Sequence, residues 1–236
     1  VRYDLIIDAQ GLLKSAVVAG LAKGTVAGLD GQSAREPLSR RFYQETVSVP
    51  RSQHAVTRVR QLFARTLGYE VQIGDPNYGL DQRVQLEPTW PTRVMLLHGT
   101  TWESKHWPRD CWRELARSLG ESDIEVVLTS GSAKEKERAE FVVRDLPNAR
   151  LLPQMPLTDV MHEMALCHGV VSVDSGLGHL AVAMEKPVIG IYGATNSTLT
   201  GMYGRQVITL ATRHLPCAPW LRKDCQYLPL PNQTAI

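Results

Sequence analysis

The chain has 236 residues, of which 43% are hydrophobic and 21% charged, so it can form one large globular domain or two modest ones. Its 26 basic and 24 acidic residues leave a formal net charge of +2, which gives no basic tract for nucleic acid and no acidic tail. No apolar run approaches the ~20 residues that a membrane-spanning helix needs.

The chain opens on Val1 with neither an initiating Met nor a signal-peptide pattern, so we expect the start of the protein to lie upstream. Its cysteines form no C-x-x-C pair, which predicts a reduced, cytoplasmic setting. Cys111 and Cys167 lie in helix-like apolar patterns and are expected to be inert core residues. Cys217 and Cys225 flank a Pro-rich loop, and their role stays open because two thiols without a nearby His are thin evidence for a metal site.

The first region offers few regular elements. Residues 4–8 predict a strand, residues 12–23 the helix after it, and residues 54–67 an amphipathic helix. Residues 74–91 have no sustained period, so we place a domain linker in their second half and divide the chain into domains 1–84 and 85–236.

Beyond the linker, strands and helices alternate regularly. Strands are predicted at 93–98, 124–129, 150–152, 170–174, 187–192 and 207–210, and helices at 109–119, 133–145, 157–168 and 178–185. This alternation indicates a parallel, doubly wound α/β sheet with helices on both faces. Ligands of such sheets bind beyond the carboxyl ends of the strands, so the residues after each strand are the candidates for chemistry.

The first strand-end loop begins with His98-Gly99-Thr100-Thr101 and continues through Lys105 to Pro108. Backbone N–H groups and hydroxyls could hold a phosphate there while the ammonium of Lys105 neutralises its charge. The alternative is a polar loop that ends at Pro108, where a helix begins.

Asp174-Ser175-Gly176-Leu177-Gly178-His179 follows another strand and opens a helix. The helix N-terminus can bind an anion, the glycines allow a ligand close to the backbone, and His179 can donate to a phosphate or sugar hydroxyl. In the structural alternative, Asp174 or Ser175 is only the N-cap and His179 faces the core.

A third loop carries Ser132 and Glu135 at the spacing of a capping box. Glu135 could equally accept hydrogen bonds from a ribose. A fourth loop, at residues 193–196, could close the site.

These loops together predict a nucleotide-diphosphate site at one edge of the sheet. The chain lacks the G-x-G-x-x-G spacing of dehydrogenases, the Walker spacing of P-loop enzymes and the nucleophile elbow of hydrolases. Its histidines show no ligand spacing, so we predict no metal.

Several motifs, in order, resemble the lipopolysaccharide heptosyltransferases, and among them the heptosyltransferase I group. They are Ile7-Asp8-Ala9-Gln10-Gly11-Leu12 with Lys14-Ser15-Ala16, Ala34-Arg35-Glu36-Pro37-Leu38, Gln53-His54-Ala55-Val56, Lys105-His106-Trp107-Pro108, and Ser172-Val173-Asp174-Ser175-Gly176-Leu177 with His179. The resemblance spans nearly the whole chain. It implies the GT-B fold, with two Rossmann-like parallel-sheet domains of which the first is incomplete here.

The resemblance also implies residue roles. Thr100, Thr101 and Lys105 match the group that holds the donor diphosphate, Glu135 the acidic residue at the ribose, and Asp174, Ser175, Gly176 and His179 the turn at the pyrophosphate and heptose. Lys14 and Arg35 match basic positions for the anionic Kdo–lipid A acceptor. ADP-heptose would be the donor, with no cofactor and no metal, and the enzyme would work peripherally on the cytoplasmic face of the inner membrane.

One family feature has no counterpart in this sequence. Family members begin with a strand and a glycine-rich loop carrying an Asp, the proposed general base, whereas Asp8 matches a different strand. Because inversion needs a base opposite the leaving nucleotide, we expect the base upstream of Val1 and no catalysis by this chain alone. A sugar-nucleotide epimerase and a non-catalytic nucleotide-sugar binding module remain alternatives.

Overall fold

The computed structural model of the protein describes residues 1–71, 74–80 and 91–212. The chain divides into two compact units, Val1–Gly74 with Thr198–Thr200, and Asp75–Ser197 with Gly201–Ile236. The predicted boundary between residues 84 and 85 lies outside the described residues, as do Cys217 and Cys225. Within the described part of the chain, no helix is long and apolar enough to cross a membrane.

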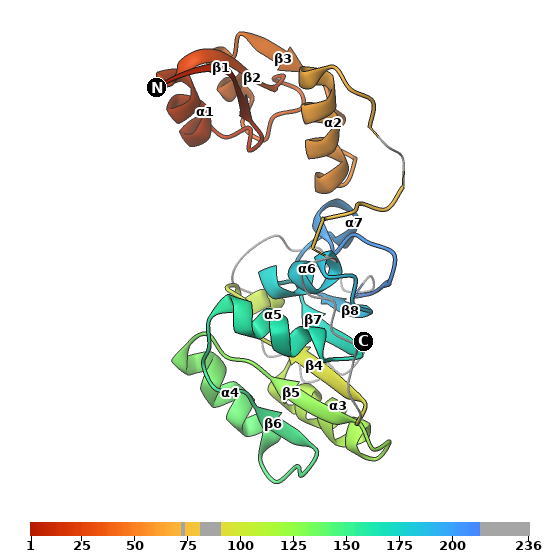
Figure 1. Cartoon of the computed structure of the whole chain (residues 1–236). Coiled ribbons are helices and arrows are strands. Elements are labelled where there is room, and N and C mark those ends of the chain that lie inside the picture. Colours follow the sequence, from red (N-terminus) through yellow and green to blue (C-terminus); the bar gives the residue numbers. More distant parts are fainter. Residues whose placement is uncertain (72–73, 81–90, 213–236) are drawn as a thin grey trace. The chain divides into compact units, whose positions relative to one another are not determined.

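The first unit is built on a small parallel sheet (Figure 1). Its described residues form the strands β1 (Arg2–Asp8), β2 (Lys23–Leu29) and β3 (Glu45–Val47), paired in that order. The helical segments are α1 (Leu13–Leu21), the 3-10 helix η1 (Pro37–Phe42) and α2 (Ala55–Leu67). Ala16 and Ala19 of α1 pack with Val26, and Leu62 of α2 packs with Leu29, so the unit has two small apolar clusters.

The sequence prediction missed β2. The helix predicted to reach Lys23 ends at Leu21, and Lys23 already begins the strand. Gly24 and Gly28 dilute the apolar alternation that signals a strand. Tertiary packing explains Gly28, because a Cβ there would lie 2.4 Å from the ring of Tyr43.

The second unit follows the predicted alternation of strands and helices closely. Its strands are β4 (Arg93–Leu97), β5 (Glu125–Leu128), β6 (Ala149–Leu151), β7 (Gly169–Val173), β8 (Val188–Tyr192) and β9 (Val207–Ala211). Its helical elements are η3 (Glu103–Lys105), α3 (Arg109–Gly120), α4 (Ala133–Val143), α5 (Leu157–Ala165) and α6 (Gly176–Ala183). The short helix α7 (Ser197–Thr200) follows β8 along the chain, and its last three residues are grouped with the first unit. The predicted parallel, doubly wound sheet is confirmed.

The six strands described in this unit lie in the order β6-β5-β4-β7-β8-β9, and every pair is parallel. Numbered along the chain, this is the order 3-2-1-4-5-6 of dinucleotide-binding folds. The order reverses between β4 and β7, so this pair forms the topological switch point. Ligands of open α/β sheets bind outside the carboxyl ends of the strands at that point.

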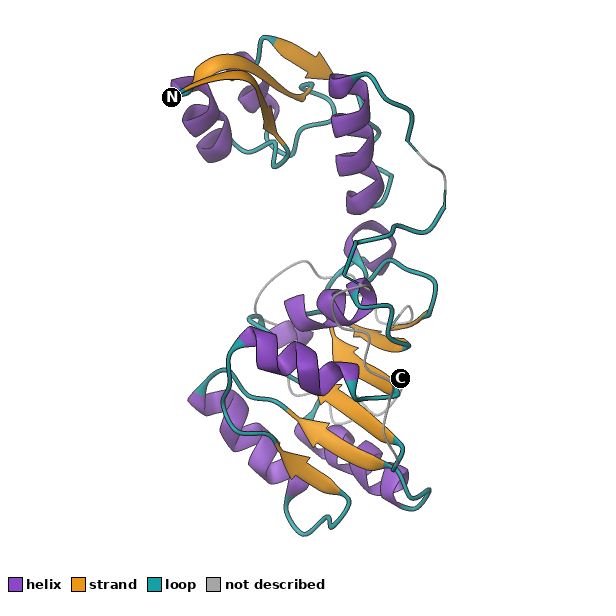
Figure 2. Ribbon diagram, in the orientation of Figure 1, coloured by secondary structure: helices purple, strands orange, loops and turns teal. Residues whose placement is uncertain are grey.

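Helices cover both faces of this sheet (Figure 2). Met95 and Leu97 of β4 pack in one cluster with Met164 of α5 and other apolar residues of α5 and α6. Leu96, between them in sequence, packs in the other cluster with Trp112 of α3 and with α4. This alternation along β4 is the physical basis of the three-layer arrangement.

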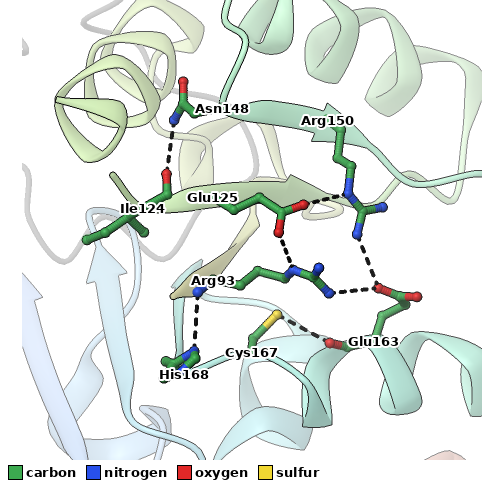
Figure 3. A network of polar contacts seen from close by, with 8 residues as sticks. All are labelled: Arg93, Ile124, Glu125, Asn148, Arg150, Glu163, Cys167 and His168. Carbon is green, nitrogen blue, oxygen red and sulfur yellow. Dashed lines mark hydrogen bonds and ion pairs between the residues drawn. The ribbon is translucent and has the colours of Figure 1, made fainter. Parts of the chain in front are cut away.

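A charged network links the starting ends of β4, β5 and β6 to α5 (Figure 3). Glu125 accepts from Arg93 Nε and from Arg150 Nε, each at 2.8 Å. Glu163 of α5 lies 3.8 Å from Arg93 Nη1 and 3.7 Å from Arg150 Nη2. Burial raises the pKa of Glu125, but hydrogen bonds from Arg150 and Arg93 outweigh it and leave the pKa below its ordinary value. The network stabilises the end of the sheet opposite to the strand-end loops.

Candidate nucleotide site

Two predicted site residues meet at the switch point. Lys105 ends η3 in the loop after β4, and Asp174 directly follows β7. Lys105 Nζ lies 2.8 Å from Asp174 Oδ2 and 4.6 Å from the centre of the Trp102 ring. The loop thus holds an ammonium group at the carboxyl ends of the two central strands, where a parallel sheet binds its ligand.

Asp174 is the most connected polar residue of this site. Besides Lys105, Thr195 Oγ1 donates to Oδ2 at 2.7 Å, and His179 Nε2 lies 3.7 Å from Oδ1. Thr100 Oγ1 donates to the backbone carbonyl of Asp174 at 3.0 Å. Burial raises the pKa of Asp174, but polar contacts from His179, Lys105 and Thr195 outweigh it and lower the pKa from 3.8 to about 2. The carboxylate is therefore ionised and holds three loops together.

The start of α6 combines a structural cap with an open backbone. Ser175 is the N-cap, and its hydroxyl accepts from the N–H of Gly178 at 3.2 Å. A Cβ on Gly178 would lie 2.5 Å from Ser172 Oγ, whereas a Cβ on Gly176 would meet nothing within 4 Å. Gly178 therefore serves packing, and only Gly176 leaves room for a ligand. The side chain of His179 is 45% exposed, so the alternative that it faces the core is wrong.

Glu135 is the third residue of α4, the helix that follows β5. Ser132 caps the helix and accepts from the N–H of Glu135 at 3.3 Å, as the capping spacing predicts. Oε2 of Glu135 accepts from the N–H of Gly131 at 2.7 Å. Oε1 lies against Gly99, so close that a Cβ on Gly99 would be only 2.7 Å from it. Glu135 is thus held beside the loop after β4 while remaining half-buried.

Thr195 was not assigned a role from the sequence, although its loop was expected to close the site. Its hydroxyl contact with Asp174 joins the loop after β8 to the loop after β7. Thr101 lies exposed beside Thr100 on the first loop. The signal that could have found Thr195 is its position three residues after the end of β8, at the same sheet edge.

Lys14 and Arg35 lie in the first unit, Lys14 in the first turn of α1 after β1 and Arg35 in the loop after β2. Both side chains are exposed. The segments are in contact, because Glu36 N donates to Gly11 O at 3.0 Å and Leu13 N donates to Glu36 Oε2 at 2.6 Å. A cleft of about 680 Å³ along β1 and α1 includes Lys14 in its lining.

No ligand set for a metal ion is present among the described residues, since no three or more His, Cys, Asp or Glu side chains gather there. Cys167 is buried, and burial raises the pKa of its thiol to about 12. Cys111 is partly exposed on α3, and burial again raises its pKa. Cys167 is the core residue that the sequence predicted, whereas Cys111 is not, because its place on α3 leaves it partly exposed. The raised pKa of each thiol is typical of an unreactive cysteine.

The sequence and the fold are similar to known heptosyltransferases. The model of glycosyltransferase family 9 (heptosyltransferase) matches residues 1–230. The lipopolysaccharide heptosyltransferase 1 of Pseudomonas aeruginosa is 48% identical over 232 residues, which are 97% of this chain and 65% of that protein. The chain therefore spans about two thirds of the length of such relatives.

Two solved structures of the Escherichia coli heptosyltransferase WaaC have the same fold. The structure with ADP is 39% identical with a TM-score of 0.83 and covers 89% of this chain and 67% of its own. The structure with ADP-2-deoxy-2-fluoro heptose is 38% identical with a TM-score of 0.80, at 89% and 66% coverage. The chain belongs to glycosyltransferase family 9, the heptosyltransferases.

Proposed function

We propose that the second unit binds ADP-heptose at the β4/β7 switch point, and that the protein transfers L-glycero-D-manno-heptose from it to the inner-core Kdo of lipopolysaccharide. The observation that carries the proposal is the contact between Lys105 and Asp174 at the carboxyl ends of the two central strands. The similar WaaC structures with ADP and with a donor analogue support the same ligand.

The donor roles follow from the position of each group. Lys105, with the hydroxyls of Thr100 and Thr101, would neutralise and hold the diphosphate. The N-terminus of α6, with its partial positive charge, suits the same anion. Glu135 would accept from the ribose, and the turn of Asp174, Ser175, Gly176 and His179 would contact the pyrophosphate and heptose.

The acceptor role belongs to the first unit in this proposal. Lys14 and Arg35 are exposed on adjacent strand-end segments and would meet the anionic Kdo–lipid A. The guanidinium of Arg35 suits a phosphate because it can donate two parallel hydrogen bonds. Transfer would proceed with inversion, without a metal, on the cytoplasmic face of the inner membrane. None of these residues has the role of general base in this proposal.

Calorimetric titration of the folded chain with ADP and ADP-heptose tests the donor site. We expect Lys105→Ala to weaken both affinities at least about tenfold, because a charge-assisted contact to phosphate contributes about 1.5–3 kcal/mol. Lys136→Ala is the matched control, since its side chain is 63% exposed and pairs with Glu140 on α4. Failure of the folded wild-type chain to bind either nucleotide would overturn the donor assignment.

Turnover with acceptor separates the functional alternatives. Consumption of ADP-heptose only when Kdo–lipid A is added supports a transferase. Conversion of the nucleotide sugar without acceptor would indicate an epimerase. Donor binding without either reaction would indicate a binding module.

A further inference from the structure

His98 is a fully buried histidine at the end of β4 that the donor contacts above do not use. Its side chain is 0% exposed, and its Nε2 lies 3.0 Å from the backbone carbonyl oxygen of Glu135. A carbonyl can only accept, so Nε2 carries the proton and donates. Nδ1 is then an unprotonated acceptor, and it has no hydrogen-bond partner within the described structure. Burial lowers the pKa of His98, which keeps the ring neutral.

A second histidine of the same loop makes a second link to α4. His106 Nδ1 donates to the carbonyl oxygen of His98 at 3.3 Å, and its Nε2 accepts from Nη1 of Arg138 at 3.3 Å. Arg138 follows Glu135 by about one turn of α4. The side chain of His106 is only 12% exposed, so this link is also shielded from water.

Gly99 completes the contact between the loop and the helix. The carboxylate of Glu135 occupies the space that a side chain on Gly99 would fill, with Oε1 at 2.7 Å from that Cβ position. The loop after β4 therefore contacts the first two turns of α4 at three places, through His98, Gly99 and His106. This loop carries Lys105, and the first of these turns carries Glu135.

We propose that His98 and His106 are positioning residues that clamp the first two turns of α4 to the loop after β4, and so fix Glu135 relative to Lys105 for nucleotide binding. The part that concerns nucleotide rests on the proposed function. A buried Phe would fill the space of His98 without an unpaired Nδ1, but it could not donate to Glu135. The donor on Nε2 is thus what distinguishes a clamp from an ordinary core side chain.

Three variants of the full chain test the clamp. His98→Gln keeps an amide donor near the position of Nε2, whereas His98→Phe keeps the ring volume and removes the donor. Trp112→Phe is the control for burial, because Trp112 of α3 is also 0% exposed and belongs to the apolar cluster between α3, α4 and the sheet. We expect amide exchange at residues 136–139 to be about fivefold faster in His98→Phe, as one lost hydrogen bond implies, and close to wild type in the other two.

The affinity for ADP is the second readout. We expect His98→Phe to weaken it about tenfold, and His98→Gln to stay within about twofold of wild type. Equal exchange rates and equal ADP affinity in His98→Phe and wild type would overturn the clamp. The clamp would also be overturned if Trp112→Phe, at the same loss of thermal stability, showed the same faster exchange and the same weaker ADP affinity as His98→Phe.

Nitrogen NMR of the histidine rings gives a readout that needs neither ligand nor mutation. We expect His98 to show a protonated Nε2 and an unprotonated Nδ1, and the opposite tautomer would overturn the clamp. Absence of ADP binding by the wild-type chain would count against the proposed donor site alone, because exchange rates and tautomer still decide the clamp. If His98→Phe does not fold, His106→Leu breaks the second link and carries the same expectations.

Discussion

The ammonium of Lys105 lies 2.8 Å from the carboxylate of Asp174, although the two residues belong to loops after different strands. The contact forms because β4 and β7 are parallel neighbours, which brings their carboxyl ends to one edge of the sheet. Thr195 and His179 approach the same carboxylate. Asp174 therefore holds the loops after β4, β7 and β8 together at the proposed nucleotide site.

Replacing Asp174 by Asn tests this organising role. The change leaves Lys105, which is 17% exposed, without its carboxylate. We expect the free energy of unfolding to fall by about 1–3 kcal/mol, measured by urea denaturation. Asp123→Asn is the control, because Asp123 is exposed and its positive φ of 57° suits Asn. Equal stability of the two variants would contradict the role of Asp174.

The stability should also depend on pH through Asp174. Its pKa is lowered from 3.8 to about 2, so the unfolded chain binds a proton at a higher pH than the folded chain does. The stabilisation, of about 2 kcal/mol, is therefore present above pH ~4 and lost as the pH falls toward 2. Urea unfolding at pH 6 and pH 3 should show a smaller decrease in Asp174→Asn than in wild type. Parallel pH profiles would rule this contribution out.

The glycines of α6 should separate ligand binding from folding. Gly176→Ala is expected to raise stability by roughly 0.5–1 kcal/mol, since its Cβ meets nothing, but to weaken ADP binding by occupying ligand space. Gly178→Ala should instead cost about 1–3 kcal/mol, because its Cβ would press on Ser172. Thermal unfolding and calorimetry of both variants check this. Unchanged ADP affinity in Gly176→Ala would remove Gly176 from the site.

The network around Glu125 should contribute to stability without affecting the ligand. Glu125→Gln removes the charge that Arg93 and Arg150 share, and Arg93 is only 14% exposed. We expect a loss of about 1–3 kcal/mol in urea unfolding, with ADP affinity unchanged because the network lies at the opposite ends of the strands. Glu114→Gln is the control, since Glu114 is 66% exposed and pairs with Arg117 on the surface of α3. A weaker ADP affinity in Glu125→Gln would show coupling between the two ends.

The sequence determined most of the second unit. Periodic apolar residues predicted its parallel sheet and helices because buried strands and half-buried helices have different repeats. Motif order predicted the family. The sequence did not predict β2, because Gly24 and Gly28 have no side chain to contribute to an alternating apolar pattern. Gly28 is required by a distant residue, since the ring of Tyr43 fills the space of its Cβ.

Tertiary structure alone decided which polar groups meet. No spacing in the sequence distinguishes Gly176, which is open, from Gly178, which packs on Ser172. Nothing in the local pattern assigned Thr195 to Asp174, or placed the buried ring of His98 under the start of α4. The spacing of apolar residues along the sequence predicts each helix or strand separately. Contacts between loops depend on the order of the strands, which brings distant carboxyl ends to the same edge of the sheet.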